Sequence, residues 1–311
     1  MIDIIKINND YGKSTIGSDK KALIEFVSAN PTGPLTVGHG RGAMLGDTIC
    51  NILEWNGYQV QREYYFNNAG RQMRKLGESV YTRYNELSGV KINFPDDGYQ
   101  GKYIYEIAQK ILDENGPNLK PDSEYSFFKD FAEKMIFKNI NETLARLGLT
   151  FDSFFNEHTL YQNKEIFNVI DILREKKLVY EKDNATWFAG SRIGRDVDRV
   201  LIKNTGEPTY RLPDMAYHKN KFERNYDLII DIFGADHMDA YPDVISVMDQ
   251  LEFDTNKLKV LIHQFVTITE KGKPVKMSTR KANFVTLDEL IDKVGADVVR
   301  YFFIMRSMNS H

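Results

Sequence analysis

The chain has 311 residues and a nearly balanced charge, with 41 Lys and Arg against 44 Asp and Glu and a formal net charge of −3. This balance excludes a global field that would attract nucleic acid, so any RNA contact requires a local basic face. A single cysteine, Cys50, excludes an internal disulfide, and no apolar run reaches the ~18 residues of a membrane span, which together favour a soluble cytoplasmic protein. The length predicts one main domain with an insertion. The polar residues 1–20 predict an N-terminal linker.

The first structured segment is predicted to be a strand, a helix and a second strand. Residues Lys21 to Val27 are mostly apolar, as in a buried parallel strand. Helical spacing follows from Leu45 to Ile52, and Asn56-Gly57 provides a stop before the strand Tyr58 to Tyr65. Three glycines lie at the start of this helix, where unpaired N–H groups and the positive end of the dipole attract an anion. They are Gly38, Gly40 and Gly42.

The remaining chain is predicted to add a helix-rich insertion and the second half of a parallel sheet. Helical periodicity runs from about residue 67 to residue 181. Strand candidates follow at Asp227 to Phe233 and Leu258 to Phe265, with a ligand crevice expected at the carboxyl ends of the strands. A hairpin is expected at the rim of the sheet between Asp198 to Lys203 and Pro208 to Leu212. Further helices are expected at Met215 to Arg224, Asp288 to Val294 and Ala296 to Met305.

The glycine-rich segment fits more than one kind of site. Gly38-His-Gly-Arg-Gly-Ala43 satisfies the dinucleotide fingerprint, with Glu63 about 20 residues further on as the ribose-binding acid of a dehydrogenase. A Pro-rich segment of about ten residues separates the strand from these glycines, which argues against that fingerprint. The second interpretation is a nucleotide site in which Thr36-Val-Gly-His39 presents hydroxyl, backbone and imidazole to a triphosphate. In a third, His39 is an ordinary helix-terminal histidine and the glycines permit close packing.

Six segments, in order, resemble bacterial arginyl-tRNA synthetases, which are class I enzymes. They are Glu25 to Ala43, Tyr65-Phe-Asn-Asn-Ala-Gly70, Asp198 to Leu201, Gly206 to His218, Gly234-Ala-Asp-His237 and Val275 to Leu287, within a resemblance that runs from about Leu23 to His311. The resemblance implies an α/β fold in which the Rossmann-like parallel sheet of the class I nucleotide-binding core carries a helix-rich insertion. It implies a linker at 1–20, core halves at 21–66 and 182–287, the insertion at 67–181, a mobile loop at 270–283 and, at 288–311, the start of a helical connection to an anticodon-binding domain. The chain is accordingly expected to be a catalytic-domain fragment.

The resemblance implies an arginine–tRNA ligase that activates L-arginine with ATP and transfers it to the 3′ end of arginine tRNA. ATP is expected as a substrate accompanied by Mg²⁺, with no metal bound by the protein itself, no membrane partner and a monomeric state. The implied catalytic residues are Thr36, His39, Lys276, Ser278, Arg280 and Lys281. The implied ATP-binding residues are Gly38, Gly40, Gly42, Gly234, Asp236, His237 and Met277. The implied arginine-binding residues are Glu25, Asn30, Tyr210 and Asp214, and the residues implied for the 3′ end of the tRNA are Asn67 and Asn68.

Elementary chemistry gives the implied residues their roles. Asp214 can accept two parallel guanidinium N–H donors, and it shares a face with Tyr210 if that segment is helical. Alternatively, Asp214 caps the helix that begins at Met215. His39 would stabilise negative charge developing on the phosphates, and the cations of the mobile loop would close on the leaving pyrophosphate.

Two departures from the family pattern leave alternatives open. Thr36 stands where the family has the first histidine of its nucleotide motif, and Thr279 stands where it has the second lysine of its loop, so Arg280 or Lys281 is expected to replace that lysine. The loop is alternatively a solvated basic turn, and Gly234 to His237 alternatively form only a strand-end turn. The alternative function is a catalytically impaired nucleotide- or RNA-binding module derived from a class I synthetase. Without the family's tRNA-binding domains, low activity is expected.

Overall fold

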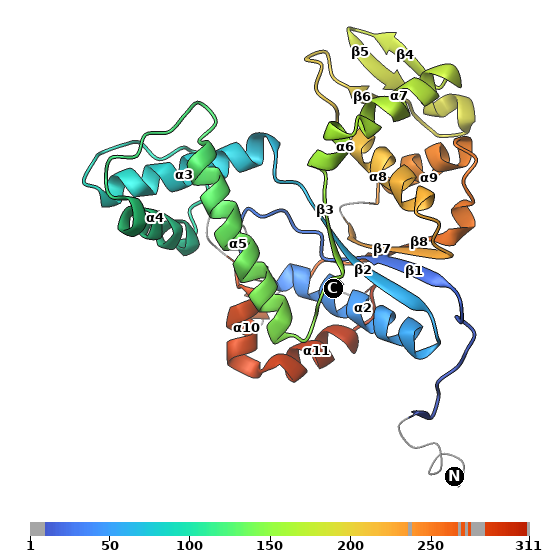
Figure 1. Ribbon diagram of the computed structural model, residues 1–311, viewed down its shortest axis with the longest axis horizontal. Helices are drawn as coiled ribbons and strands as arrows, with labels where there is room; N and C mark the ends of the chain where they lie inside the picture. Colours follow the sequence, from blue (N-terminus) through green and yellow to red (C-terminus); the bar gives the residue numbers. More distant parts are fainter. Residues whose placement is uncertain (1–9, 236–237, 267–268, 271–272, 275–283, 310–311) are drawn as a thin grey trace. The chain divides into compact units, whose positions relative to one another are not determined.

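The computed structural model describes residues 10–235, 238–266, 269–270, 273–274 and 284–309. These residues form two compact units, whose elements are labelled in Figure 1. The first, called the sheet unit below, comprises the described parts of Met1–Phe26, Gly46–Tyr65 and Phe151–His263. The second, called the helical unit, comprises those of Val27–Leu45, Phe66–Thr150 and Gln264–His311.

The sheet unit is built on a five-stranded sheet with the strand order β3-β2-β1-β7-β8. Its strands are β1 (Lys21–Glu25), β2 (Gln59–Phe66), β3 (Ser153–Asn156), β7 (Leu228–Gly234) and β8 (Leu258–His263). The pairings of β1 with β2, β1 with β7 and β7 with β8 are parallel. Because the strand order reverses at β1 and β7, the ligand crevice of this fold class lies beyond their carboxyl ends. The predicted Rossmann-like α/β fold is confirmed.

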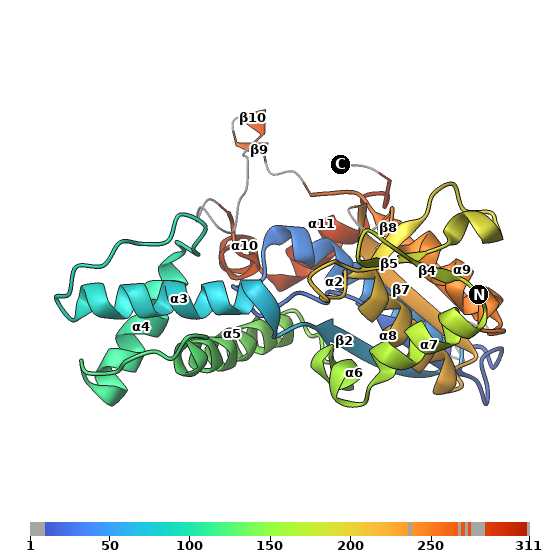
Figure 2. The same cartoon turned by 90° about the horizontal axis from the view of Figure 1, so that it is seen from above.

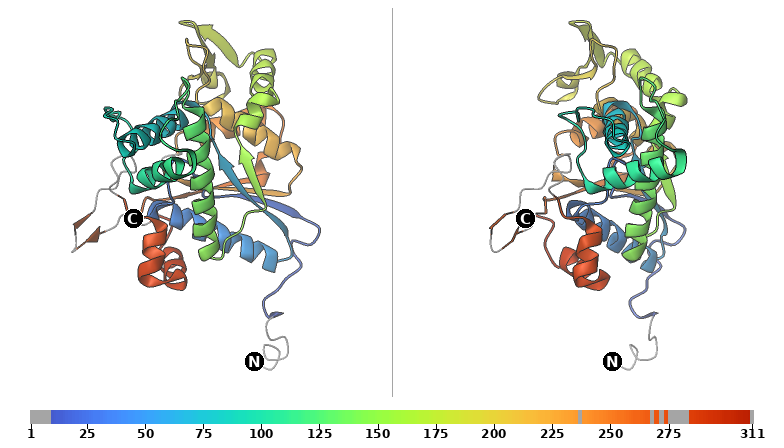
Figure 3. Two further views of the ribbon diagram at one scale, coloured as in Figure 1. Left: turned by 60° about the vertical axis from the view of Figure 1, so that its left-hand side comes forward. Right: turned by 90° about the vertical axis from the view of Figure 1, so that its left-hand side faces the viewer.

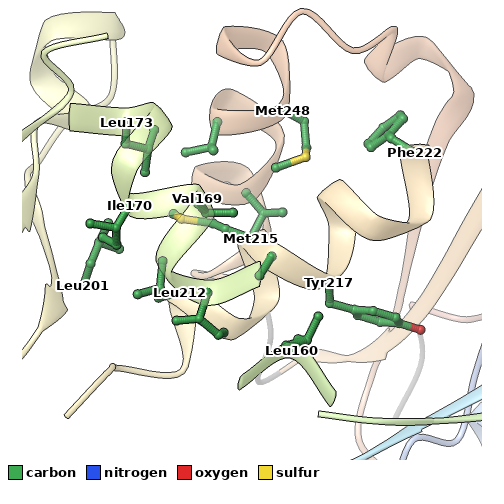
Figure 4. Packing of buried hydrophobic residues seen from close by; sticks show 14 of the residues in the cluster. Leu160, Val169, Ile170, Leu173, Leu201, Leu212, Met215, Tyr217, Phe222 and Met248 are labelled. Carbon is green, nitrogen blue, oxygen red and sulfur yellow. The ribbon is translucent and has the colours of Figure 1, made fainter. Parts of the chain in front are cut away.

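Helices cover this sheet with apolar faces. They are α6 (His158–Gln162), α7 (Glu165–Glu175), α8 (Arg211–Glu223), α9 (Tyr241–Gln250) and the second half of α2 (Val37–Trp55), with short 3-10 turns at η2 (Gly190–Ile193) and η4 (Thr255–Lys257). Side chains from α7, α8 and α9, among them Val169, Met215 and Met248, form one buried cluster (Figure 4). A Cβ at Gly46 would lie 2.2 Å from the Phe26 ring, so glycine at this position lets α2 approach the end of β1.

A smaller antiparallel sheet completes the sheet unit. Its strands are β4 (Val179–Lys182), β5 (Ala185–Phe188) and β6 (Arg199–Ile202). The expected hairpin is only partly correct, because β6 meets the returning chain in a single bridge from Ile202 to Pro208 and α8 begins at Arg211. Pro213 lies in the first turn of α8, where proline removes no helical hydrogen bond. A helix can therefore begin before this proline rather than after it.

The helical unit contains three long helices whose apolar faces meet. They are α3 (Gly70–Leu87), α4 (Lys102–Asn115) and α5 (Ser126–Arg146), which lie side by side in Figures 1 and 2. The predicted core positions Met73, Ile107 and Phe128 are buried. Two antiparallel strands of two residues each also belong to this unit. They are β9 (Thr269–Glu270) and β10 (Lys273–Pro274).

The last two helices of the unit are α10 (Leu287–Val294) and α11 (Ala296–Ile304), drawn in red in Figure 3. A capping box formed by Thr286 and Glu289 starts α10. Asp288 accepts hydrogen bonds from Thr143 (2.6 Å) and Arg146 (2.6 Å), which joins the start of α10 to α5.

Most elements lie close to their predicted positions. The observed β1, β2, β7, β8, α10 and α11 begin and end within two residues of the expected bounds. The segment 67–181, expected to be a helix-rich insertion, contains α3 to α7 but also β3, which belongs to the main sheet. The division of the chain into core halves and an insertion at 67 and 182 stays a prediction.

Candidate active site

The carboxyl end of β1 and the middle of β7 carry a buried cluster of charged side chains in the sheet unit. Glu25 ends β1 and lies in register with Asp231 of β7. The ammonium group of Lys221, from α8, lies between the two carboxylates, forming ion pairs with Glu25 and, at 2.5 Å, with Asp231 Oδ1. Lys221 and Asp231 have fully buried side chains, and that of Glu25 is 4% exposed. Burial lowers the pKa of Lys221, but the two carboxylates raise it further, so the pKa is raised overall and the lysine is charged.

His218 extends this cluster by one turn of α8. Its Nε2 lies 2.8 Å from Asp231 Oδ2, and its Nδ1 lies 2.7 Å from the backbone oxygen of Asp214. Burial raises the pKa of Asp231, yet the Lys221 charge and the His218 hydrogen bond lower it overall to about 2, so this carboxyl is ionised. Both ring nitrogens of His218 therefore face an acceptor, one the Asp214 backbone oxygen and the other the Asp231 carboxylate. Lys221 and His218 thus hold Glu25 and Asp231 in one buried network.

Asp214 is a neighbouring carboxyl whose side chain takes no part in this network. Within the described part of the chain, its side chain makes no hydrogen bond or ion pair. Burial raises its pKa to about 7; Glu25 and Glu157 add to the rise, and the charges of His218 and Lys221 oppose it. Because α8 begins at Arg211, Asp214 lies in the first helical turn, and the alternative of an N-cap before Met215 is wrong. A half-buried carboxyl without a partner is a site where a cationic ligand would be stabilised.

Two residues near Asp214 were not predicted as site residues. The Tyr65 hydroxyl donates a hydrogen bond of 2.6 Å to Glu157 Oε2. Burial raises the pKa of Tyr65 well above its usual value, and the charges of Glu157 and Asp214 add to the rise. Tyr65 opens one of the motifs quoted above, so its signal was present in the sequence. Glu157 has no such signal, because it follows the short strand β3 between segments of no recognised pattern.

Tyr210 and Asp214 face different surroundings. The backbone N–H of Asp214 donates to the Tyr210 carbonyl oxygen (3.3 Å), which confirms that the two are linked across a helical turn. The Tyr210 side chain, however, is 61% exposed, and the Arg211 guanidinium lies over its ring at 4.9 Å. The Tyr210 ring therefore does not lie in the same surroundings as the Asp214 carboxyl.

In the helical unit, the structure brings together Thr36 and His39 at the start of α2. The Thr36 backbone N–H donates to His39 Nδ1 (3.0 Å), and Thr36 Oγ1 lies 3.2 Å from the same nitrogen. Because Nδ1 accepts, the ring proton belongs on Nε2, which makes Nε2 a donor. Thr36 bridges to Thr286, and the Val37 N–H donates to the Val285 carbonyl oxygen (3.2 Å). This backbone pairing holds the His39 ring in place.

The glycines of α2 differ in what surrounds them. Gly38 is in the first turn, and a Cβ there would lie 3.4 Å from Thr36 Oγ1. A Cβ at Gly40 would lie 2.7 Å from the Phe303 ring and 3.0 Å from Leu287, so this glycine permits close packing on α10 and α11. Gly42 lies further along, in the second turn. Close packing, the third interpretation of the motif, therefore applies at Gly40.

The predicted asparagines lie together in the helical unit. The Asn30 Oδ1 accepts a hydrogen bond from the Asn67 backbone N–H (2.8 Å). Asn67 Oδ1 in turn accepts from the Ala69 N–H (2.8 Å), while Asn68 Nδ2 donates to Glu133 Oε1 (2.8 Å) on α5. Asn30 thus orders the chain that leaves β2.

Glu63 cannot be the ribose-binding acid of a dehydrogenase. It is 1% exposed and accepts two hydrogen bonds of 2.7 Å from the Arg224 guanidinium. The Tyr217 hydroxyl, which projects away from the apolar cluster in Figure 4, donates a third (2.7 Å), and the Ser153 hydroxyl donates a fourth (2.8 Å). Burial raises the pKa of Glu63, but the Arg224 hydrogen bonds and charge lower it overall. A carboxylate that accepts four internal hydrogen bonds serves the fold, so the dinucleotide interpretation is wrong.

Comparison with known proteins identifies the family of this chain. Residues 2–300 match the family described as "tRNA synthetases class I (R), catalytic domain". The chain belongs to this family. It is 56% identical over 310 residues to the arginine–tRNA ligase of Desulfotalea psychrophila and 55% identical over 313 residues to that of Chlorobium phaeobacteroides strain BS1. These alignments cover 100% and 99% of this chain but 56% and 57% of the relatives, so the chain spans a little over half of their length.

Solved structures give the same family. A Campylobacter jejuni structure assigned as an arginyl-tRNA synthetase superposes with a TM-score of 0.90 at 32% identity and covers 99% of this chain and 68% of that one. The Thermus thermophilus arginyl-tRNA synthetase, at 16% identity and a TM-score of 0.67, shares the fold; the match covers 95% of this chain and 58% of that one.

Several residues implied by membership of this family lie outside the described residues. They are Asp236 and His237 of the turn after β7, and Lys276, Met277, Ser278, Thr279, Arg280 and Lys281 of the expected mobile loop. Gly234, the last residue of β7, is described and half-buried. Among the described residues, no group of three His, Cys, Asp or Glu side chains is placed to hold a metal ion, and no helix is long and apolar enough to cross a bilayer.

Proposed function

We propose that this chain carries the catalytic activity of an arginine–tRNA ligase, which activates L-arginine with ATP and transfers it to the 3′ end of arginine tRNA. The observation that carries the proposal is the half-buried carboxyl of Asp214, which has no side-chain partner among the described residues and lies beside the buried network of Glu25, Lys221, Asp231 and His218. Such a carboxyl needs a cation, and its geometry suits the paired N–H donors of a guanidinium. The catalytically impaired module is not favoured by any observation.

Arginine recognition follows from the charges of the sheet unit. The guanidinium would bind Asp214 in its ionised form, so binding displaces the proton that burial holds there near pH 7. Glu25 would contribute as a neighbouring carboxylate whose position is fixed by Lys221. Citrulline has the shape of arginine without its charge, and it would leave the Asp214 carboxyl without a cation. Discrimination against it would therefore rest on electrostatics rather than on size.

Residues at the start of α2 would stabilise the phosphates of ATP during the reaction. The arginine carboxylate attacks the α-phosphate of ATP, and pyrophosphate leaves; this needs no general base because the nucleophile is already ionised. The His39 Nε2–H would donate to the phosphates as negative charge develops, with Thr36 orienting the ring through Nδ1 rather than contacting ATP itself. Mg²⁺ bound to ATP would neutralise phosphate charge, and Gly38 would allow the backbone of α2 to approach the nucleotide.

The remaining predicted residues complete the proposal. Asp236, His237 and the loop from Lys276 to Lys281 would bind the nucleoside and the pyrophosphate. Asn67 and Asn68 would order the segment that receives the 3′ end of the tRNA, supported by the Asn30 contact. The protein is proposed to work as a monomer in the cytoplasm.

Arginine-dependent exchange of pyrophosphate into ATP tests the proposal, measured with and without an arginine tRNA transcript. Exchange that requires arginine and is abolished by His39→Ala supports the ligase. Lysine in place of arginine is the specificity control. Binding of ATP and RNA without any arginine-dependent exchange, even with tRNA present, would instead establish the impaired module.

A further inference from the structure

The start of α2 is attached to two stretches of chain that are distant from it in the sequence, all within the helical unit. Before His39, the chain pairs with residues 285–287: the Val37 N–H donates to the Val285 carbonyl oxygen (3.2 Å), and the Leu287 N–H donates to the Leu35 carbonyl oxygen (2.8 Å). After His39, the attachment is made by the side chain of Arg41. The histidine proposed to act on the phosphates thus lies between two attachments.

The Arg41 guanidinium joins the ends of two other elements to α2. Its Nη1 donates to the Gln264 carbonyl oxygen (3.1 Å), just after β8, and its Nη2 donates to the Ser307 carbonyl oxygen (3.1 Å), which follows α11. The Gln264 N–H donates to the Met308 carbonyl oxygen (2.9 Å), so the two chain ends are also joined to each other. A planar guanidinium holds two acceptors in a fixed geometry, whereas an ammonium group is a point donor.

Arg41 is only 5% exposed, which makes a charged residue at this position informative. Burying a cation costs free energy, and an apolar side chain of similar volume would fill the same space without that cost. Burial accordingly lowers the pKa of Arg41. What the guanidinium adds is a pair of directed hydrogen bonds, which fix α2 relative to Gln264 and Ser307.

His39 and Arg41 lie on opposite sides of the helix, because residues two apart in an α-helix are rotated by about 200° about its axis. Arg41 therefore does not reach a phosphate held by His39, and it acts on the helix rather than on a ligand. Gly40, between them, packs closely against Phe303 and Leu287. The His39 ring is thus placed by close packing at Gly40, by backbone pairing before it and by Arg41 after it.

We propose that Arg41 is a positioning residue for arginine activation, which acts by fixing His39 at the start of α2. The proposal rests on the function proposed above, in which the His39 Nε2–H donates as negative charge develops on the phosphates. A displacement on the order of 1 Å weakens a contact made in the transition state more than it weakens ATP binding, to which other residues contribute. Loss of Arg41 therefore lowers kcat and leaves KM nearly unchanged.

Steady-state pyrophosphate exchange on Arg41→Met tests the proposal, because methionine fills much of the same volume without donating hydrogen bonds. With tRNA present, kcat should fall about tenfold to a hundredfold, while the KM values for ATP and arginine should change by less than about threefold. Arg300→Met is the matched control. Arg300, on α11, also donates to a backbone oxygen, that of Leu147 (2.7 Å), but just after α5. This variant should keep the parent kcat even if its melting temperature falls.

Arg41→Lys carries the test if Arg41→Met does not fold. Lysine keeps the charge but not the planar pair of donors, so kcat should still fall severalfold. A parent kcat in the folded variant, with only a lowered melting temperature, would overturn the proposal and leave Arg41 a purely structural role. A raised KM for ATP at unchanged kcat would also overturn it, because Arg41 would then contribute to ground-state binding.

Amide hydrogen exchange separates this proposal from the ligase itself, because it requires no activity. The Gln264 amide should exchange faster in the folded Arg41 variant than in the parent, and Arg300→Met should leave it unchanged. Unchanged exchange at Gln264 in the Arg41 variant would overturn the proposal. Faster amide exchange in a protein whose parent form shows no arginine-dependent pyrophosphate exchange, even with tRNA, would refute the ligase and the catalytic role of Arg41 while confirming its attachment of Gln264.

Discussion

Lys221 Nζ lies 2.5 Å from Asp231 Oδ1, and both side chains are fully buried at the centre of the sheet unit. The same ammonium group pairs with Glu25, so one lysine of α8 joins the end of β1 to the middle of β7. Strand pairing and the candidate arginine site therefore depend on the same charge. This buried ion pair fixes the position of Glu25. It adds little net stability, because the cost of desolvating the two charges offsets much of their attraction.

Removing the Lys221 charge should destabilise the protein strongly. Lys221→Met leaves two buried carboxylates without a cation, and the free energy of unfolding should fall by roughly 3–5 kcal/mol. Lys219→Met is the matched control, because Lys219 pairs only with the half-exposed Glu223 and should change stability by less than about 1 kcal/mol. Urea denaturation followed by circular dichroism measures both. Equal midpoints for the two variants would show that the buried pair is not needed.

The raised pKa of Asp214 predicts a pH-dependent stability. In the folded protein this pKa is about 7, above the ~3.9 of an unfolded chain. The stability that Asp214 contributes is therefore complete below about pH 4 and is lost as pH rises through 7. The Asp214→Asn variant has no carboxyl at this position, so its stability does not fall in this way as pH rises. The variant should be more stable than the parent at pH 8, by as much as about 4 kcal/mol, and nearly equal to it only at about pH 4. Urea midpoints across this range check the sign, and a variant less stable at pH 8 would contradict it.

The same pKa predicts that arginine binding releases a proton. Only the ionised form of Asp214 attracts the guanidinium, so the affinity should rise about tenfold per pH unit up to about pH 7 and level off above it. Calorimetry at pH 6 in two buffers of different ionisation enthalpy should detect the release of nearly one proton. Asp214→Asn should show no release. A parent protein with pH-independent arginine affinity would rule out this linkage.

Two glycines of α2 should respond differently to a methyl group. Gly40→Ala places a Cβ 2.7 Å from the Phe303 ring and should lower stability by about 1–3 kcal/mol. Gly38→Ala meets no atom closer than 3.4 Å and should be neutral or slightly stabilising, since alanine favours helix. If Gly38 allows ATP to approach, the same change should weaken ATP binding. Thermal unfolding and ATP titration separate the two roles, and equal melting temperatures would show that packing at Gly40 is loose.

The sequence predicted the central strands because their pattern is local. β1 and β7 are short apolar runs buried on both faces, and the bounds of α10 follow from its capping residues. The four-residue strands β3, β4 and β5 were not predicted, because so short a pattern has no clear periodicity. The turn between β4 and β5 nevertheless had a signal in the sequence, the pair Asp183-Asn184. Both residues adopt the positive φ that a tight hairpin requires, and Asp and Asn tolerate it better than most residue types.

The candidate site was predictable only in part. Asp214 and Glu25 lie in motifs, and a carboxylate is the natural partner of a guanidinium. Lys221 could not be predicted, because a lysine three residues from His218 in an amphipathic helix is expected at the surface. Its burial arises only when α8 packs across β1 and β7. The exposure of Tyr210 likewise depends on where α8 begins, which the proline in its first turn obscured.

Isothermal titration of the parent protein with L-arginine and with citrulline, at pH 7.5, tests the central claim that Asp214 makes the sheet unit an arginine site. Both ligands have the same length, and only arginine carries the charge. The account predicts that arginine binds at least about a hundredfold more tightly than citrulline, and that Asp214→Asn removes most of this difference. Equal affinity of the parent protein for the two ligands would contradict it.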